Sequence, residues 1–167
     1  MTPSVPIGFG QIVLDSVDAA RIAGLAAGEL CVPGVDEDAF RRAVATGRLG
    51  FSATEEGLRG GDVVCICVPT PVRDHTPDLS YVEQACRDVA RHLTAGRLVI
   101  LESSTYPGTT TELVGPLLET SGLRAGRDFL LAYSPERIDP GNREFHFGNT
   151  PRIVGGASDS MYVLSFS

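Results

Sequence analysis

The 167-residue sequence predicts an α/β fold: an open, mainly parallel, doubly wound sheet with helices on both faces. Two observations lead to this fold class. Short apolar runs rich in β-branched residues alternate along the chain with segments of helical character. The strongest run, residues 63–68, is apolar without interruption, which is typical of a strand covered on both faces of a parallel sheet.

The first third of the chain predicts strands and helices in alternation. Residues 12–15 end a strand, and residues 16–27 form a helix with Asp18 near its start. The second helix carries three acidic residues at its N-terminus, where they interact favourably with the helix dipole. The remaining elements predicted here are that helix over 36–46, a weak strand over 49–52 and a short helix over 54–58.

The rest of the chain continues the alternation. Residues 63–68 and 97–101 are separated by a helix, so we expect them to be adjacent, parallel, central strands. A polar loop is expected over 138–151, and residues 157–167 carry no recognisable helix. The other elements predicted are helices over 78–93 and 109–120 and strands over 128–133 and 152–155.

Composition and charge exclude several classes of protein. A net charge of −7 and the absence of Trp argue against a nucleic-acid partner. No apolar run is long enough to span a bilayer and no signal peptide is visible, so we expect no membrane association and a cytoplasmic location. The four cysteines show no metal-binding spacing, and we expect no metal. Cys65 and Cys67 are interpreted as small core residues inside the sheet.

Polar residues follow four of the predicted strands at their carboxyl ends. Ligands of open parallel sheets bind beyond these ends, so the four segments form one candidate site. The alternative is that any α/β domain carries polar loops there. The segments are Asp15, Pro69–Thr70–Pro71, Glu102–Ser103–Ser104–Thr105 and Ser134–Pro135–Glu136–Arg137.

Four stretches of the sequence, in order, resemble the NAD-binding domain of the UDP-glucose/GDP-mannose dehydrogenase family. The resemblance as a whole covers roughly residues 12–158, and the second and third stretches are most similar to the branch that acts on UDP-N-acetyl-hexosamines. The resemblance implies a Rossmann-like fold. The stretches are Ile66–Pro71, Glu102–Thr110, Ser134–Asn142 and Pro151–Gly156.

This resemblance also implies a reaction. Enzymes of the family use NAD to oxidise the 6-hydroxymethyl group of a nucleotide sugar to a carboxylate. A cysteine holds the aldehyde as a thiohemiacetal, and water then cleaves the thioester. The implied cofactor is therefore NAD, and the implied substrate of the full-length protein is a UDP-sugar.

Several residues match the family's cofactor-binding positions. Asp15 matches the acid that accepts the adenosine ribose hydroxyls, although it could simply initiate a helix. Val68, Pro69 and Thr70 match the loop that passes under the dinucleotide, where the Thr70 hydroxyl could donate to the cofactor. The alternative for this loop is a simple turn. Thr105 is a further candidate for cofactor contact.

Three more residues match positions implicated in catalysis or substrate binding. Ser104 lies where the family usually has Thr, thought to orient a catalytic water, and Thr105 is the alternative one residue on. Glu136 matches a glutamate that could activate water, and Arg137 could bind a substrate phosphate or the carboxylate product. The alternatives are helix capping for the hydroxyls and ordinary surface charges for Glu136 and Arg137.

The sequence departs from the family pattern at both ends. Gly8 and Gly10 have the spacing of a Gly-x-Gly-x-x-Gly loop, but Val13 stands at its third glycine. We therefore expect an altered start over 1–11, a partial domain over 12–158 that lacks the first strand–glycine loop–helix unit, and an atypical tail over 159–167. Weak or lost NAD binding and self-association through an exposed sheet edge follow from this. No Gly-Gly-x-Cys motif and no UDP-binding domain are visible.

The sequence leaves competing functions open. The first is an incomplete N-terminal domain of an NAD-dependent nucleotide-sugar 6-dehydrogenase. The second is a non-catalytic nucleotide-binding or interaction remnant of that family. An unrelated α/β nucleotide-binding module is a third, which the order of the four stretches makes improbable.

Overall fold

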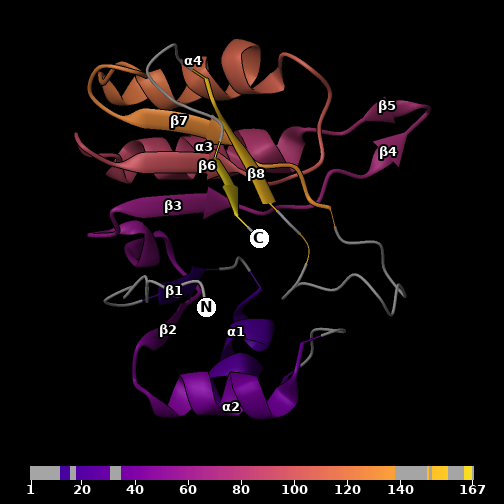
Figure 1. Ribbon diagram of the computed structural model, residues 1–167, viewed down its shortest axis with the longest axis vertical. Helices are drawn as coiled ribbons and strands as arrows, with labels where there is room; N and C mark the ends of the chain where they lie inside the picture. Colours follow the sequence, from indigo (N-terminus) through magenta and orange to yellow (C-terminus); the bar gives the residue numbers. More distant parts are fainter. Residues whose placement is uncertain are drawn as a thin grey trace, which may run out of the picture. The chain divides into compact units, whose positions relative to one another are not determined.

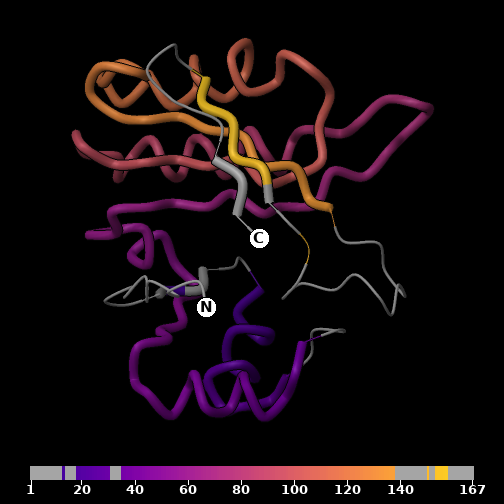
Figure 2. Tube along the Cα trace, in the orientation of Figure 1, coloured from indigo at the N-terminus to yellow at the C-terminus, as the bar shows by residue number. Residues whose placement is uncertain are grey.

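The computed structural model describes residues 12–15, 18–30, 35–137, 150, 152–157 and 164–166. The chain divides into two compact units, which Figures 1 and 2 trace from indigo to yellow. Unit 1 is Met1–Arg59 and unit 2 is Gly60–Ser167. Residues 1–11 and, except for residue 150, the loop predicted over 138–151 lie outside the described residues.

Unit 1 contains a two-stranded parallel sheet. β1 (Ile12–Asp15) pairs with β2 (Leu49–Ser52) in a register that places Asp15 opposite Ser52. Parallel strands need a long crossover, and the chain between them supplies two helices. These are α1 (Ala19–Ala26) and α2 (Glu37–Ala45), and η1 (Glu55–Leu58), a 3₁₀ turn, follows β2.

Both helices of unit 1 begin at an aspartate cap. The Asp18 carboxylate accepts a hydrogen bond from the Arg21 amide at 3.0 Å, and that of Asp36 accepts from the Ala39 amide at 2.6 Å. Such caps satisfy amides that have no partner inside the helix. The buried face of α1 carries Ile22 and Leu25. Sequence periodicity therefore predicted this part of the fold closely, with the helices one to three residues shorter at each end.

The sheet of unit 2 has five strands in the order β3-β6-β7-β8-β9. The first three are mutually parallel and the last two are antiparallel, so the predicted mainly parallel sheet and the pairing of β3 with β6 are confirmed. The five strands are β3 (Val63–Ile66), β6 (Leu98–Leu101), β7 (Leu130–Tyr133), β8 (Arg152–Gly156) and β9 (Leu164–Phe166).

The central position predicted for residues 63–68 is wrong. Among the described residues β3 is the end strand of its sheet, and Val63 is 44 % exposed. Burial alternates along β3, with Val64 and Ile66 buried and Val63 and Cys65 exposed. An uninterrupted apolar run therefore does not establish that both faces of a strand are covered.

Helices of unit 2 cover the buried face of this sheet. The strands advance in one direction from β3 to β6 to β7, and right-handed crossovers place both connecting helical segments on the same face. Val82, Cys86 and Leu118 of this layer are completely buried. Its elements are α3 (Ser80–His92), the π-helical turn η2 (Thr109–Val114), α4 (Gly115–Leu118) and the 3₁₀ turn η3 (Glu119–Ser121). No described helix of unit 2 is long and apolar enough to cross a membrane, and the same holds for those of unit 1.

A short hairpin projects from unit 2 between β3 and α3 (Figure 1). It consists of β4 (Val72–Arg73) and β5 (Thr76–Pro77), which pair antiparallel. The two turn residues, Asp74 and His75, have φ angles of 49° and 62°, as a tight turn that matches the twist of its strands requires. The pattern of residues did not predict this hairpin, because its strands are only two residues long.

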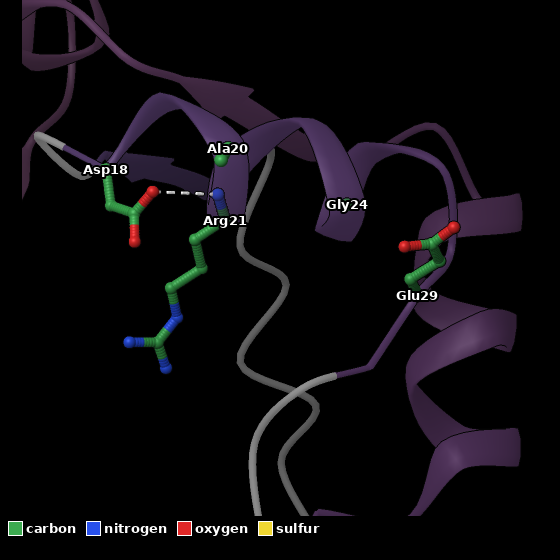
Figure 3. Close-up of a pocket in the computed structure, with 5 residues that line it drawn as sticks. All are labelled: Asp18, Ala20, Arg21, Gly24 and Glu29. Atoms are coloured by element: carbon green, nitrogen blue, oxygen red, sulfur yellow. Dashed lines mark hydrogen bonds between the residues drawn. The ribbon is translucent and has the colours of Figure 1, made fainter.

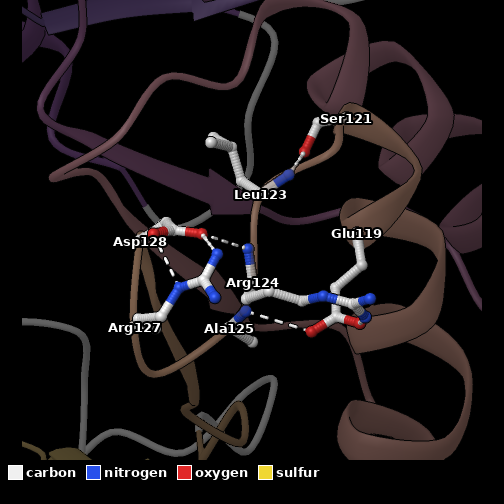
Figure 4. Close-up of polar contacts among 7 residues, drawn as sticks. All are labelled: Glu119, Ser121, Leu123, Arg124, Ala125, Arg127 and Asp128. Carbon is white, nitrogen blue, oxygen red and sulfur yellow. Dashed lines mark hydrogen bonds and ion pairs between the residues drawn. The ribbon is translucent and has the colours of Figure 1, made fainter.

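Charged side chains organise the loop that leads into β7 (Figure 4). Glu119 accepts a hydrogen bond from the Ala125 amide at 3.1 Å and one from the Arg124 guanidinium at 2.8 Å, which together lower the pKa of its carboxyl. The Arg127 guanidinium and the Arg124 amide likewise lower the pKa of Asp128. These contacts fix the start of β7 and hence the position of its carboxyl end.

The last strands depart from the sequence expectation in one respect. The strand predicted over 152–155 is observed as β8. The segment 159–167, expected only as an atypical tail, contributes β9, which pairs antiparallel with β8.

Candidate functional site

The carboxyl ends of β3, β6 and β7 lie at one edge of the unit 2 sheet, because the three strands are adjacent and parallel (Figure 1). The segments that follow them are 67–70, 102–105 and 134–137, here called the strand-end site. All the predicted site residues of unit 2 fall within these segments. Ligands of open α/β sheets bind at this edge.

Ser103 ties the first two segments together. Its side chain is 5 % exposed. The hydroxyl oxygen accepts a hydrogen bond from the Val68 amide at 2.9 Å, and the hydroxyl donates to the Val68 carbonyl at 2.8 Å. One hydroxyl therefore satisfies both backbone groups of the first residue in the predicted cofactor loop. Sequence reasoning did not select Ser103, although it follows the strand as Ser104 does.

Thr70, in the first segment, makes a second connection to the segment that follows β6. Its hydroxyl donates to the Ser104 carbonyl at 2.8 Å. A threonine hydroxyl has one proton and two lone pairs. Because the carbonyl of Ser104 takes that proton, the Thr70 oxygen remains able to accept a hydrogen bond but not to donate a second one in this arrangement.

Cys67 lies at the strand-end site, where its thiol donates to the Glu102 carboxylate at 3.2 Å. The expectation that Cys65 and Cys67 are buried core residues is wrong, because both are exposed. Cys65 belongs to the open face of β3 and Cys67 follows the strand, and the apolar run that contains both does not reveal which face of the strand is covered. Cys86, in contrast, is buried in α3, and burial raises the pKa of its thiol to about 12.

The third segment starts with Ser134, whose amide donates to the Leu101 carbonyl at 2.9 Å. Ser134 is 1 % exposed, and within the described part of the chain its hydroxyl has no hydrogen-bond partner. Glu136 and Arg137 follow and are exposed. The Glu136 carboxylate accepts a hydrogen bond from the Arg137 amide at 2.7 Å. This segment therefore presents both predicted charges at the surface.

Asp15 lies where the sequence predicts it, at the carboxyl end of β1. It belongs to unit 1 and the other predicted site residues to unit 2. Its role in ribose binding therefore stays a prediction, as do the roles of Val68, Pro69, Thr70, Ser104, Thr105, Glu136 and Arg137.

Two open hollows lie elsewhere. One of about 400 Å³ is in unit 1 beside α1, where Arg21 extends away from the helix and Asp18 caps it (Figure 3). The other, of about 440 Å³, is in unit 2, and the two arginines that line it pair with carboxylates of their own helix. Neither hollow is lined by a predicted site residue. In the described part of the chain no group of three or more His, Cys, Asp or Glu side chains could hold a metal ion.

Residues 6–164 match the model of the UDP-glucose/GDP-mannose dehydrogenase family, NAD binding domain. The chain belongs to this family. The resemblance of the four stretches and the α/β fold class are thereby confirmed.

Similar proteins include dehydrogenases of UDP-N-acetyl sugars. UDP-N-acetyl-D-mannosamine dehydrogenase of Pyrococcus horikoshii is 40 % identical over 126 residues, which are 75 % of this chain and 30 % of the relative. UDP-N-acetyl-D-glucosamine 6-dehydrogenase of Pseudomonas aeruginosa is 35 % identical over 163 residues, 95 % of this chain and 38 % of the relative. The chain thus spans about a third of the length of these relatives.

A solved structure supports the same assignment. NDP-N-acetyl-D-galactosaminuronic acid dehydrogenase of Methanosarcina mazei aligns with a TM-score of 0.81 and 31 % identity. The alignment covers 90 % of this chain and 34 % of that one. The backbone described above is therefore the backbone of this family's NAD-binding domain.

Proposed function

We propose that the strand-end site binds the dinucleotide NAD and that the chain is the NAD-binding part of a UDP-sugar 6-dehydrogenase. Such an enzyme converts the sugar's 6-hydroxymethyl group to a carboxylate. The observation that carries the proposal is the convergence of polar residues at the ends of three adjacent parallel strands, in a chain of this family. The named relatives favour a UDP-N-acetyl-hexosamine as the sugar nucleotide.

The residues present fit an adenine dinucleotide. The Asp15 carboxylate would accept hydrogen bonds from ribose hydroxyls and would repel a 2′-phosphate, which favours NAD over NADP. Val68, Pro69 and Thr70 would line its path, with Thr70 able to accept a hydrogen bond, and Thr105 would supply a further hydroxyl. Among the described residues the buried Ser134 hydroxyl has no hydrogen-bond partner, which supports unused bonding capacity at the strand ends. When bound, NAD supplies a hydride acceptor.

The chain's own groups would act on water and substrate. Ser104 is exposed at the end of β6 and would orient a water molecule, while the exposed Glu136 carboxylate would take its proton. Arg137, beside Glu136, would bind the substrate's phosphate or the carboxylate product. These roles need the reacting groups within hydrogen-bond distance of each other when substrate is bound.

Turnover by this chain alone is not expected. Thioester formation needs an activated thiolate. Cys67 is the described thiol at the strand-end site, and in this arrangement it acts as a hydrogen-bond donor to the Glu102 carboxylate and not as a nucleophile. Val13 lies in β1, and the described residues contain no Gly-x-Gly-x-x-Gly loop that would hold the pyrophosphate, so we expect weak NAD binding. A non-catalytic nucleotide-binding remnant is therefore the competing function. The expected location is the cytoplasm.

Binding and turnover measured on the same chain test the proposal. NMR titration with NAD should shift the amide signals of Cys67, Val68 and Thr70 at millimolar concentration, and NADP should shift them less. Absorbance of NADH with UDP-N-acetylglucosamine, UDP-N-acetylmannosamine or UDP-glucose should stay at background.

Each possible result has a defined meaning. No NAD-dependent shift in these segments would contradict the cofactor site. Steady NADH production, lost in Glu136→Gln, would instead show that the chain is catalytic. Cys67→Ser would then decide whether Cys67 replaces the family's cysteine.

A further inference from the structure

Two pairs of residues at the strand-end site are joined by side-chain hydrogen bonds, and the two bonding side chains come from opposite segments. Ser103, after β6, bonds both backbone groups of Val68, after β3. Thr70, after β3, bonds the carbonyl of Ser104, after β6. The two residues of each pair are 34 or 35 positions apart in the chain, so none of these hydrogen bonds arises from the geometry of a local turn.

The Ser103 bonds continue the sheet beyond its last backbone rung. The ladder between β3 and β6 ends with the Glu102 amide, which donates to the Ile66 carbonyl at 2.9 Å. Beyond this last backbone hydrogen bond, the Ser103 hydroxyl takes the place of a backbone partner. It bonds the amide and the carbonyl of Val68, directly before the segment that contains Pro69 and Pro71. Prolines restrict φ but donate no hydrogen bond, so the loop itself contributes little to fixing its own position.

We propose that Ser103 is a positioning residue of the cofactor site: its hydroxyl fixes Val68 and thereby the loop 69–71. This inference rests on the proposed function, because the loop matters only if the dinucleotide passes along it. Ser103 acts through Val68 and needs no contact with the cofactor. Thr70 completes the arrangement from the other side and places the backbone of Ser104.

Amide hydrogen exchange of the full 167-residue chain tests the structural half of the proposal. In Ser103→Ala the Val68 amide loses its acceptor and should exchange about tenfold faster or more, whereas the Val64 and Ile66 amides should keep their rates. Unchanged exchange at Val68 would overturn the proposal.

A matched pair of threonine variants supplies the control. Thr70→Val removes the hydroxyl that bridges the two segments. Thr120→Val removes one that bonds Leu117 only three residues away. Thr70 is at the surface of the loop, so this variant tests the arrangement even if Ser103→Ala fails to fold.

NAD titration tests the functional half. Ser103→Ala and Thr70→Val should each weaken NAD about tenfold, the loss expected for one displaced hydrogen bond. Thr120→Val should bind like the unchanged chain, and Thr70→Ser should restore binding. If the unchanged chain binds NAD and Ser103→Ala binds equally well, the positioning role is wrong while the proposed function stands. If the unchanged chain does not bind NAD, the proposed function itself is wrong.

Discussion

Units 1 and 2 build the same kind of parallel strand–helix–strand structure with different amounts of buried surface. In unit 1, the buried apolar side chains described are Ile22, Leu25 and Phe40, each 6–8 % exposed, and Phe40 packs edge-on against Phe51 with ring centroids 6.5 Å apart. In unit 2, a whole set of side chains has no exposed surface at all. That set is Val82, Cys86, Val99, Leu101, Val114, Leu118 and Ala132.

Capped, amphipathic helices therefore do not by themselves supply a large buried core. Unit 1 has two well-capped helices but a sheet of two described strands. Two-stranded sheets are marginal in isolation, whereas five strands under a helical layer bury a continuous core. We therefore expect unit 2 to carry most of the stability and unit 1 to open first.

The largest expected effect is in amide hydrogen exchange. Amides of Val99 and Leu101 in β6 should exchange about 10³-fold more slowly than those of β1 and β2, because they open only with the whole of unit 2. Amide exchange measured by NMR, or by mass spectrometry of short peptides, gives separate rates for β6 and for β1 and β2. If the amides of residues 12–15 in a monomeric sample exchange as slowly as those of β6, the expected difference in stability between the two units is wrong.

Core truncation should give the next largest effect. Leu101→Ala, at a position with no exposed surface, should cost unit 2 about 2–5 kcal/mol of unfolding free energy. All four tyrosines of the sequence lie after residue 60, so tyrosine fluorescence during denaturation reports on unit 2. The matched variant Leu25→Ala should leave that transition nearly in place. A Leu25→Ala shift as large as that of Leu101→Ala would show that the two units unfold together.

Cys86 should make unit 2 sensitive to alkaline pH. The folded state keeps this thiol protonated until pH about 12, whereas the unfolded thiol ionises near pH 9.0. Unfolding above that pH therefore releases a proton, and stability should fall by about 1.4 kcal/mol per pH unit as pH rises through this window. Below pH 9.0 the group should have no effect.

Stability curves of the unchanged chain and of Cys86→Ala, recorded from pH 8 to pH 11, should differ in slope by that amount. Thiol labelling followed by peptide mass spectrometry gives an independent check. Cys65 and Cys67 should react in the folded state, and Cys86 only after unfolding. Rapid labelling of Cys86 in the folded protein would contradict its burial.

Self-association through an exposed sheet edge stays a prediction, and β3, the end strand of the described unit 2 sheet, offers such an edge. Val63 and Leu130 occupy the same face in register through Leu98, and they are 44 % and 39 % exposed. Val63→Lys should weaken association about tenfold, from the apolar surface that it removes. Sedimentation at several concentrations measures this. Val72→Lys, on the hairpin, is the control and should leave association unchanged.

The smallest effect concerns the surface charges that hold the start of β7. The pKa of Asp128 is lowered by Arg127 and by the Arg124 amide, so its contribution to stability is present above the carboxyl's unfolded pKa. That contribution is lost as pH falls through the folded pKa. Asp128→Asn should lower the melting temperature slightly at neutral pH and not at all in acid. Glu37→Gln, in an ion pair on unit 1, is the control for loss of an exposed charge.

The elements with local signals could be predicted from the sequence. Asp18 and Asp36 cap helices because their carboxylates reach amides three residues on, and this needs no distant partner. The runs 63–66 and 98–101 form adjacent parallel strands because a helix lies between them. The family was identified by the resemblance of four ordered stretches of sequence, and the family model confirms it.

Tertiary structure alone decided which face of each strand is covered and which hydroxyls bridge the segments. Whether Cys65 and Cys67 are buried depends on where the helices pack, and the apolar run that contains them reads the same in either case. Ser103, Ser104 and Thr105 are chemically similar neighbours, yet Ser103 alone reaches both backbone groups of Val68. Which of the three hydroxyls bonds Val68 depends on the direction of one side chain relative to a segment 35 residues away in the chain. A local sequence pattern carries no information about that direction.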